Sequence, residues 1–180
     1  MIPKYPSGYG GAMVSLAAMR LRSDVRALDP EMRRRVFRLM RHLGRLGVPL
    51  GIGGGGRSTA EQTALFLSRH YEDPAGTIFW DGKRWTKKSG VAAAAPPGRS
   101  YHEQTPPYGA LAVDTVPPES WDEQNLICSL FGLRHFANVN GEPWHLQPVE
   151  MPTSRSTYNA SPQSYKLTRW KFPPLPKVQK

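Results

Sequence analysis

The stretch that decides the fold covers residues 29–58 and reads DPEMRRRVFRLMRHLGRLGVPLGIGGGGRS. Asp29 can cap the free amides of a helix, and Pro30 suits the first helical position. Apolar residues then recur at the 3.6-residue period of one buried face. The opposite face carries Arg33, Arg34, Arg38, Arg41 and Arg45. Gly47 is a natural helix stop, and residues 48–52 predict a short buried strand before four glycines.

The elements that follow are short and mixed. Ser58 forms a capping box with Glu61 and predicts a second helix. A hairpin is expected around Asp81-Gly82 within residues 78–85. The later elements expected are a strand over 110–116, a helix over 120–132 and a strand over 144–147. Brief, separated strands with a hairpin favour an antiparallel sheet, so the predicted fold class is α+β, a small antiparallel sheet with packed helices.

Charge divides the chain of 180 residues, whose net charge is +10. Residues 1–46 carry a net charge of +7 and residues 150–180 carry +5, whereas residues 47–149 carry −2. Basic flanks of this kind can follow nucleic acid, anionic lipid or an anionic wall polymer equally well. The organisation expected is a basic N-terminal extension over 1–28, one domain over 29–150 and an extended basic tail over 151–180.

Composition excludes several classes of protein. Hydrophobic residues make up 39% of the chain, too many for a polyelectrolyte-like disordered protein. Cys128 is the single cysteine, so no internal disulfide can form, and we expect a buried, inert thiol. No apolar run reaches the 18 residues that a membrane span needs. Residues 12–19 are too short for a signal peptide and are followed by arginines, so none is expected.

Polar residues interrupt apolar, glycine- or proline-bounded stretches at three places. His102, Asp114 and His145 offer two imidazoles and a carboxylate, a ligand set that suits zinc at a catalytic site. Glu142 lies three residues before His145 and can act as a general base. Arg57, on a glycine-rich turn, can stabilise the oxyanion of a tetrahedral intermediate.

Each of these residues has a plainer interpretation. A lone histidine is more often a surface or core residue than a ligand, and we place His42, His70 and His135 in that class. Asp114 can simply cap a turn at a strand end. Arg57 can be a loop charge or a phosphate-binding group at a helix start. The joint occurrence of the residues favours the metal site.

Three segments carry a resemblance to a known family. They are Gly56-Arg57-Ser58, Ser100-Tyr101-His102 with Ala112-Val113-Asp114, and Glu142-Pro143-Trp144-His145. In this order they resemble the motifs of the zinc D-Ala-D-Ala metallopeptidase family, which includes D,D-carboxypeptidases, D-Ala-D-Ala dipeptidases and bacteriophage L-Ala-D-Glu endopeptidases. The resemblance spans residues 29–150 and implies that this part is a zinc peptidase domain.

The resemblance also implies a role for each site residue. His102, Asp114 and His145 would bind Zn²⁺, Glu142 would be the base, and Arg57 the electrostatic stabiliser. Ser100 and Arg57 would contact substrate. Two departures stand out: His102 and Asp114 lie farther apart than in the family, which marks Gln104–Tyr108 as an inserted loop, and Gly56 replaces an aromatic residue.

The expected function is zinc-dependent cleavage of a peptide bond in the peptidoglycan stem peptide, of the D,D-carboxypeptidase or L,D-endopeptidase type. The size and the lone domain fit a bacteriophage protein for wall penetration or lysis, located on the virion tail or in the host cytoplasm before release. Expected partners are the stem peptide and, through the basic termini, other phage tail proteins, with no nucleic acid. A non-catalytic tail protein that binds the wall is the alternative. A nucleic-acid binder ranks last, because no recognition motif accompanies the charge.

Overall fold

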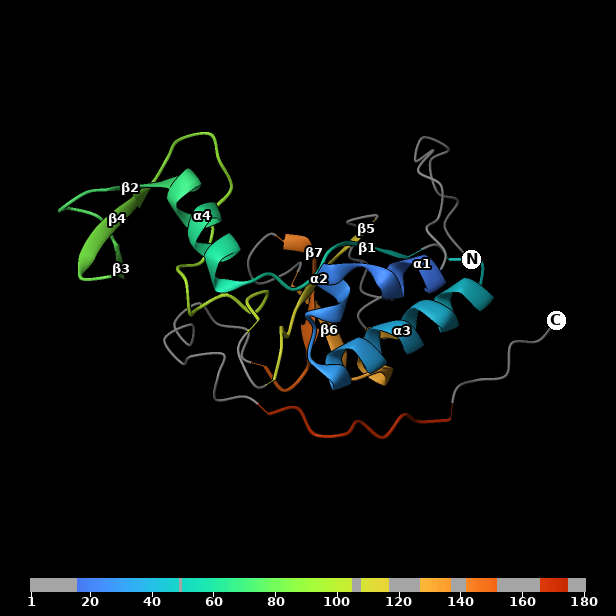
Figure 1. Ribbon diagram of the computed structural model, residues 1–180. Helices are drawn as coiled ribbons and strands as arrows, with labels where there is room; N and C mark the ends of the chain where they lie inside the picture. Colours follow the sequence, from blue (N-terminus) through green and yellow to red (C-terminus); the bar gives the residue numbers. More distant parts are fainter. Residues whose placement is uncertain are drawn as a thin grey trace.

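The computed structural model describes residues 16–48, 50–104, 108–116, 127–136, 142–151 and 166–174, with only the backbone at positions 136, 142 and 143. Within these residues the protein combines helices with two antiparallel sheets, as an α+β fold requires (Figure 1). None of the described helices has the length and apolar character needed to cross a membrane.

The long helix predicted from the opening stretch is confirmed. It is α3 (Pro30–Arg45), and the Oδ1 atom of Asp29 accepts hydrogen bonds from the amides of Glu31 and Met32 at 2.7 and 3.2 Å. The capping box of Ser58 is also present, at the start of α4 (Thr59–Arg69). Two short helices that the sequence patterns did not predict precede them, α1 (Leu16–Leu21) and α2 (Ser23–Arg26).

The larger sheet has the strand order β1-β5-β7-β6, and every neighbouring pair is antiparallel. Its strands are β1 (Gly51–Gly54), β5 (Val113–Val116), β6 (Leu133–Phe136) and β7 (Glu142–Pro148). The strands predicted near residues 50, 113 and 145 are present with shifted ends, and β6 is an addition. A register shift interrupts the pairing of β6 with β7 between His135 and Phe136.

The smaller sheet confirms the predicted hairpin. β3 (Ile78–Trp80) and β4 (Lys83–Lys87) are joined at Asp81 and Gly82, which have positive φ angles of 52° and 72°, as a tight hairpin turn requires. β2 (His70–Glu72) pairs with the other edge of β4 and was not predicted. Together with α4, this sheet forms one end of the molecule, and α1 and α3 lie at the other (Figure 1).

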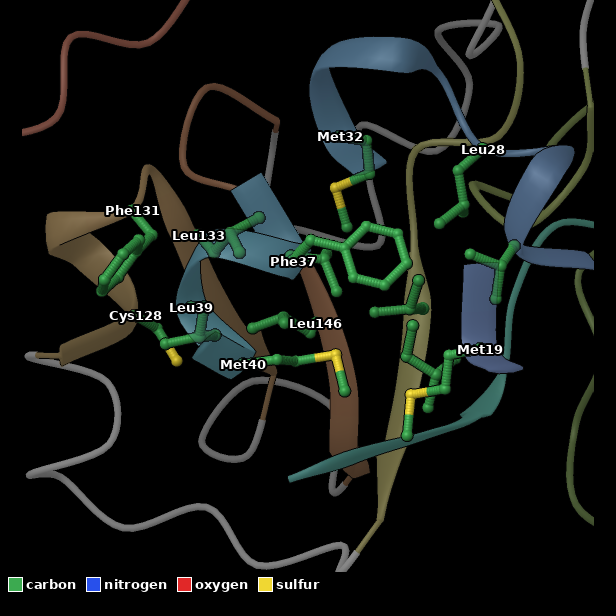
Figure 2. Packing of buried hydrophobic residues seen from close by; sticks show 14 of the residues in the cluster. Met19, Leu28, Met32, Phe37, Leu39, Met40, Cys128, Phe131, Leu133 and Leu146 are labelled. Atoms are coloured by element: carbon green, nitrogen blue, oxygen red, sulfur yellow. The ribbon is translucent and has the colours of Figure 1, made fainter. Parts of the chain in front are cut away.

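The core lies between α3 and the larger sheet (Figure 2). Met32, Leu39 and Met40 of α3 pack in one cluster with Leu133 of β6 and Leu146 of β7, and all are buried. Met19 of α1, Val25 of α2 and Leu28 belong to the same cluster, so the described residues before α3 contribute to this core.

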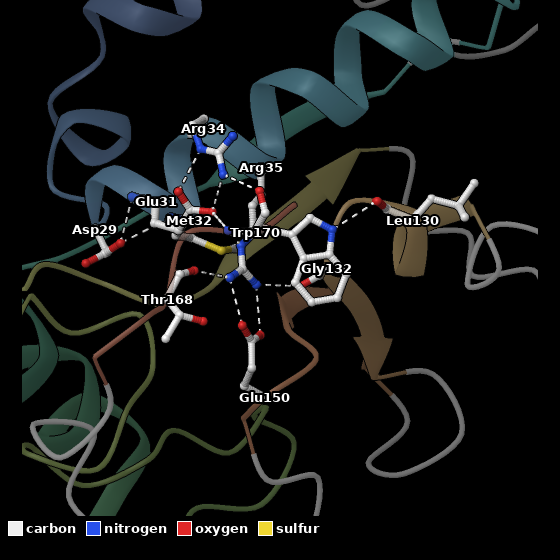
Figure 3. Close-up of polar contacts among 10 residues, drawn as sticks. All are labelled: Asp29, Glu31, Met32, Arg34, Arg35, Leu130, Gly132, Glu150, Thr168 and Trp170. Atoms are coloured by element: carbon white, nitrogen blue, oxygen red, sulfur yellow. Dashed lines mark hydrogen bonds and ion pairs between the residues drawn. The ribbon is translucent and has the colours of Figure 1, made fainter. Parts of the chain in front are cut away.

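A buried arginine joins α3 to the chain near the C-terminus (Figure 3). Arg35 is fully buried, and its guanidinium forms ion pairs with Glu31 at 3.0 Å and Glu150 at 2.7 Å. It also donates to the carbonyl oxygen of Thr168 at 2.9 Å. The amide of Trp170 donates to Glu31 at 2.8 Å. Residues 166–174, which form neither helix nor strand, are thereby held against α3.

Some predictions lie partly outside the described residues. Of the helix expected over 120–132, residues 127–130 are helical and 120–126 lie outside the described part. Most of the tail expected over 151–180 and of the extension expected over 1–28 lies outside it as well. Residues 105–107 of the Gln104–Tyr108 segment are also not described.

Candidate metal centre

Two candidate ligands sit on neighbouring strands of the larger sheet. Asp114 of β5 and His145 of β7 are direct cross-strand partners. Side chains at directly opposed positions of an antiparallel pair project from the same face of the sheet. His145 and its strand neighbour Leu146 are both buried, Leu146 within the core and His145 beside Asp114. Successive side chains of β7 therefore point to opposite faces of the sheet, Leu146 into the core and His145 toward the candidate metal centre.

The third candidate ligand, His102, comes from a loop that is hydrogen-bonded to the backbone of Arg57. The amide of Arg57 donates to the carbonyl oxygen of His102 at 2.7 Å, and the amide of Gln104 donates to the carbonyl oxygen of Arg57 at 2.7 Å. The hydroxyl of Ser100 accepts from the amide of His102 at 3.3 Å and closes the turn before it. These bonds bring the two predicted segments together.

The three side chains converge within a small space. The Nε2 atom of His102 lies 3.1 Å from Nδ1 of His145 and 3.2 Å from Oδ1 of Asp114. The Nδ1 atom of His145 lies 3.7 Å from the same carboxylate oxygen. Both histidines are buried and Asp114 is partly buried. The structure therefore assembles His102, Asp114 and His145 into a group that could bind a metal ion.

A glycine carbonyl fixes the orientation of His102. The Nδ1 atom of His102 lies 3.0 Å from the carbonyl oxygen of Gly55. A carbonyl oxygen only accepts, so Nδ1 carries the proton, and Nε2 of the neutral ring has a lone pair that a metal ion can bind. Metal-binding histidines typically make this kind of outer hydrogen bond.

Asp24 of α2 in turn fixes the position of Gly55 by hydrogen bonding. Its Oδ2 atom accepts from the amide of Gly55 at 2.9 Å, and its backbone oxygen accepts from the amide of Gly56 at 2.8 Å. A Cβ atom on Gly56 would lie 2.8 Å from the Cβ of Ala110 and 2.9 Å from that of Ala27. The position where the resembled family has an aromatic residue therefore has no room here for a side chain.

Electrostatics favour an ionised carboxylate at the centre. Burial alone raises the pKa of Asp114, but the close contacts with His102 and His145 outweigh it and hold this pKa well below its ordinary value. Burial lowers the pKa of His102, against the opposing effect of Asp114, and favours the neutral ring. An ionised carboxylate beside a neutral imidazole is the protonation state that a divalent metal requires.

The donor set and spacing fit zinc. Zinc takes histidine nitrogen and carboxylate oxygen at about 2.0–2.1 Å in tetrahedral geometry, which puts ligand atoms about 3.3 Å from one another. The three separations within this group, 3.1, 3.2 and 3.7 Å, are close to that value. The Oδ1 atom of Asp114 is buried and accepts no hydrogen bond within the described part of the chain. A metal ion would satisfy this oxygen.

The group opens into a cavity of about 540 Å³. Three guanidinium groups line it: those of Arg57, Arg69 and Arg99. Phe79 from the smaller sheet and Trp144 from β7 line it as well, and both are exposed. The cavity thus combines positive charge with apolar surface beside the candidate ligands.

Arg57 lies at the cavity beside the candidate ligands, and its role as the electrostatic stabiliser stays a prediction. It lines the cavity together with Asp114. Burial lowers the pKa of Arg57, and the negative charge of Asp114 acts in the opposite direction. Ser100 also lines the cavity and is buried. Glu142 begins β7 opposite Phe136, but its side chain lies outside the described part, so its role as the base stays a prediction.

The remaining histidines stay apart from this group. His42, His70 and His135 are buried and are not members of the described metal-binding cluster. Burial lowers the pKa of His42, whose ring lies 5.5 Å from that of Phe131. Of the surface and core positions expected for such histidines, these three occupy core positions.

Sequence reasoning missed four residues that shape the site. Asp24 and Gly55 position His102, and Arg69 and Arg99 add charge to the cavity. Asp24 was hard to identify from the sequence, because its partner Gly55 lies 31 residues away.

No protein-family model matches this chain, and no curated protein sequence matches it.

Proposed function

We propose that this protein is a zinc-dependent peptidoglycan hydrolase that cleaves a peptide bond in the stem peptide. The observation that carries the proposal is the convergence of His102, Asp114 and His145 at a cavity that also contains Arg57. Zinc would be held by these three side chains, and three protein ligands leave a further position open for catalysis. When bound, zinc supplies a Lewis acid that polarises the peptide carbonyl and lowers the pKa of water.

The residues of the chain account for the other requirements of peptide hydrolysis. Glu142 accepts the proton of the attacking water and returns it to the leaving amine. Arg57 stabilises the negative charge that develops on the carbonyl oxygen, because its guanidinium is partly shielded from solvent beside the ligands. Ser100 fixes the turn that carries His102 and contributes a hydroxyl to the cavity wall.

The lining of the cavity supports a substrate with a free carboxylate. Arg57, Arg69 and Arg99 give it a positive charge, and stem peptides carry carboxylates on their acidic residues and at their C-terminus. Gln62 is fully buried at the cavity wall, and its amide donates to the carbonyl oxygen of Ala95 at 2.5 Å. Its Oε1 atom is buried and accepts no hydrogen bond within the described residues.

Peptide-bond cleavage is a proposal that rests on the resemblance for its substrate, because zinc and a base alone specify only a hydrolase. Membership of the zinc D-Ala-D-Ala metallopeptidase family, an origin in a bacteriophage and a role in wall penetration or lysis are parts of the same proposal. A tail protein that grips the wall without cutting it is the competing function. The two differ in whether products form.

Mass spectrometry of digested peptidoglycan tests the proposal. Purified peptidoglycan is incubated with the zinc-loaded chain and, as the matched control, with the same preparation after demetallation. We expect new fragments whose masses correspond to one broken stem-peptide bond, only in the zinc-loaded sample. Fragments from cut glycan, equal cleavage after demetallation, or wall binding without fragments would each contradict it.

A further inference from the structure

A second hollow lies on the outer side of the helices. It has a volume of about 480 Å³ and is formed by α1, the end of α2 and α3. Six of its lining residues are arginines: Arg20, Arg26, Arg33, Arg34, Arg38 and Arg41. We call it the arginine groove. No acidic residue is among the described residues that line it.

Most of this charge is uncompensated. Arg34 is paired with Glu31 at 2.7 Å, and Arg38 lies over the ring of Phe172 at 4.4 Å. Within the described part of the chain, no ion pair or side-chain hydrogen bond involves Arg26, Arg33 or Arg41. Guanidinium groups gathered without acids raise the local concentration of anions.

The arginines are spaced along a helix, which favours an extended anion. From Arg33 to Arg41 the axis of α3 rises about 12 Å. A single small anion occupies only part of that length, whereas a chain with regularly repeated phosphates can contact several guanidinium groups at once. Arginine is well suited to this role because its planar fork binds phosphate oxygens in pairs.

The groove lacks the features that recognise bases. Its aromatic residue, Phe37, is 8% exposed, and the guanidinium of Arg20 covers its ring at 5.1 Å. Proteins that bind single-stranded nucleic acid combine positive charge with open aromatic rings on which bases stack. A backbone of phosphodiesters without bases fits the arginine groove better.

We propose that the arginine groove binds a linear phosphodiester polymer of the poly(glycerol phosphate) type, an anionic polymer of bacterial walls. The affinity for phosphodiesters rests on the charges of the groove alone. The choice of a wall polymer over other sources also rests on the proposed function. The groove lies on the helices at the end of the molecule opposite α4 and the smaller sheet, so it could tether the protein while the cavity engages the stem peptide (Figure 1).

The test measures binding of a fluorescent poly(glycerol phosphate) oligomer to the full chain by anisotropy, over a series of salt concentrations. The groove variant carries Arg26→Gln, Arg33→Gln and Arg41→Gln. The control variant loses the same charge from the smaller sheet through Lys83→Gln, Arg84→Gln and Lys87→Gln, all exposed. We expect the groove variant to bind about tenfold more weakly or worse, with a salt slope smaller by about two to three. The control variant stays near the parent.

Each other outcome is decisive. Equal weakening in both variants means that only net charge matters and overturns the groove as a site. Absence of parental binding at low salt also overturns it. Tighter binding of single-stranded DNA with the same number of phosphates overturns the wall polymer as the occupant. Cleavage of a soluble stem peptide, measured in parallel, is expected to be unchanged in the groove variant, so failure of tethering and failure of hydrolysis are distinguishable.

Discussion

Asp114 on β5 and His145 on β7 face each other across one antiparallel strand pair, so the register of that pair fixes two of the three candidate ligands. A shift of one residue would move either side chain to the opposite face of the sheet. The third ligand, His102, comes from a loop that is bonded to the arginine segment and to Gly55. The larger sheet thus supplies two of the candidate ligands, and the loop supplies the third.

Asp114→Asn is expected to weaken zinc binding by more than about 100-fold, since a neutral amide is a poor substitute for a carboxylate ligand. Zinc should raise the melting temperature of the parent and leave that of this variant unchanged, because a ligand stabilises only a folded state that binds it. Asp81→Asn is the matched control, because Asn tolerates the positive φ at this hairpin position. Metal analysis after gel filtration and thermal unfolding measure both effects. Equal zinc content in the two variants would remove Asp114 from the ligand set.

Asp24→Ala is expected to weaken zinc binding by about 10- to 100-fold without removing a ligand. The loss of its carboxylate frees Gly55, whose carbonyl oxygen orients His102. Asp24→Asn keeps an acceptor for the amide of Gly55 and should retain most of the affinity. Glu72→Ala, which removes an exposed carboxylate paired with Lys83, serves as the control. Competition with a coloured chelator gives the affinities, and parental affinity in Asp24→Ala would show that His102 needs no such support.

Arg35→Met is expected to lower the free energy of unfolding by about 3–5 kcal/mol, because it leaves Glu31 and Glu150 without their buried partner. Arg33→Met on the same helix should change it by only about 0.5 kcal/mol, since that side chain is partly exposed and unpaired within the described residues. Urea unfolding followed by tryptophan fluorescence compares the two. If both variants unfold at the same urea concentration, the ion pairs of Arg35 contribute little to holding residues 166–174 against α3.

Cys128 is expected to resist thiol reagents in the native protein. Burial raises the pKa of its thiol to about 12, so on the order of 10⁻⁴ of the molecules carry a thiolate at pH 8. Its side chain is also 1% exposed, which blocks access. Colour development with a disulfide reagent should be slow in buffer and complete within the mixing time in concentrated urea. Rapid reaction in buffer would mean that the core around Cys128 opens easily.

Local patterns predicted the parts of the fold that local interactions determine. The cap at Asp29, the capping box at Ser58 and the Asp81-Gly82 turn each involve neighbours in sequence, and all three are present. Arg35 could not be assigned in this way, because Glu150 and Thr168 lie 115 and 133 residues away. β2 and β6 were missed because each is short and is defined by its partner strand, not by its own alternation.

The candidate site was predictable as a set of residues but not as a geometry. The segments around His102, Asp114 and His145 each carry a recognisable pattern, and the structure brings them together. The support for His102 was not predictable, because Asp24 lies in a segment that the charge pattern assigned to a basic extension. The place of Glu142 relative to His145 depends on the register shift between β6 and β7, which no spacing rule reveals.

The most direct test of the central claim compares zinc content and turnover in Glu142→Gln. This variant keeps all three proposed ligands and loses only the proposed base, so we expect it to bind one zinc ion per chain, as we expect of the parent. Its rate of stem-peptide cleavage should fall by about two to four orders of magnitude, because an amide cannot accept the proton of the attacking water. Cleavage within a few-fold of the parental rate, or loss of zinc from Glu142→Gln, would contradict the proposed mechanism.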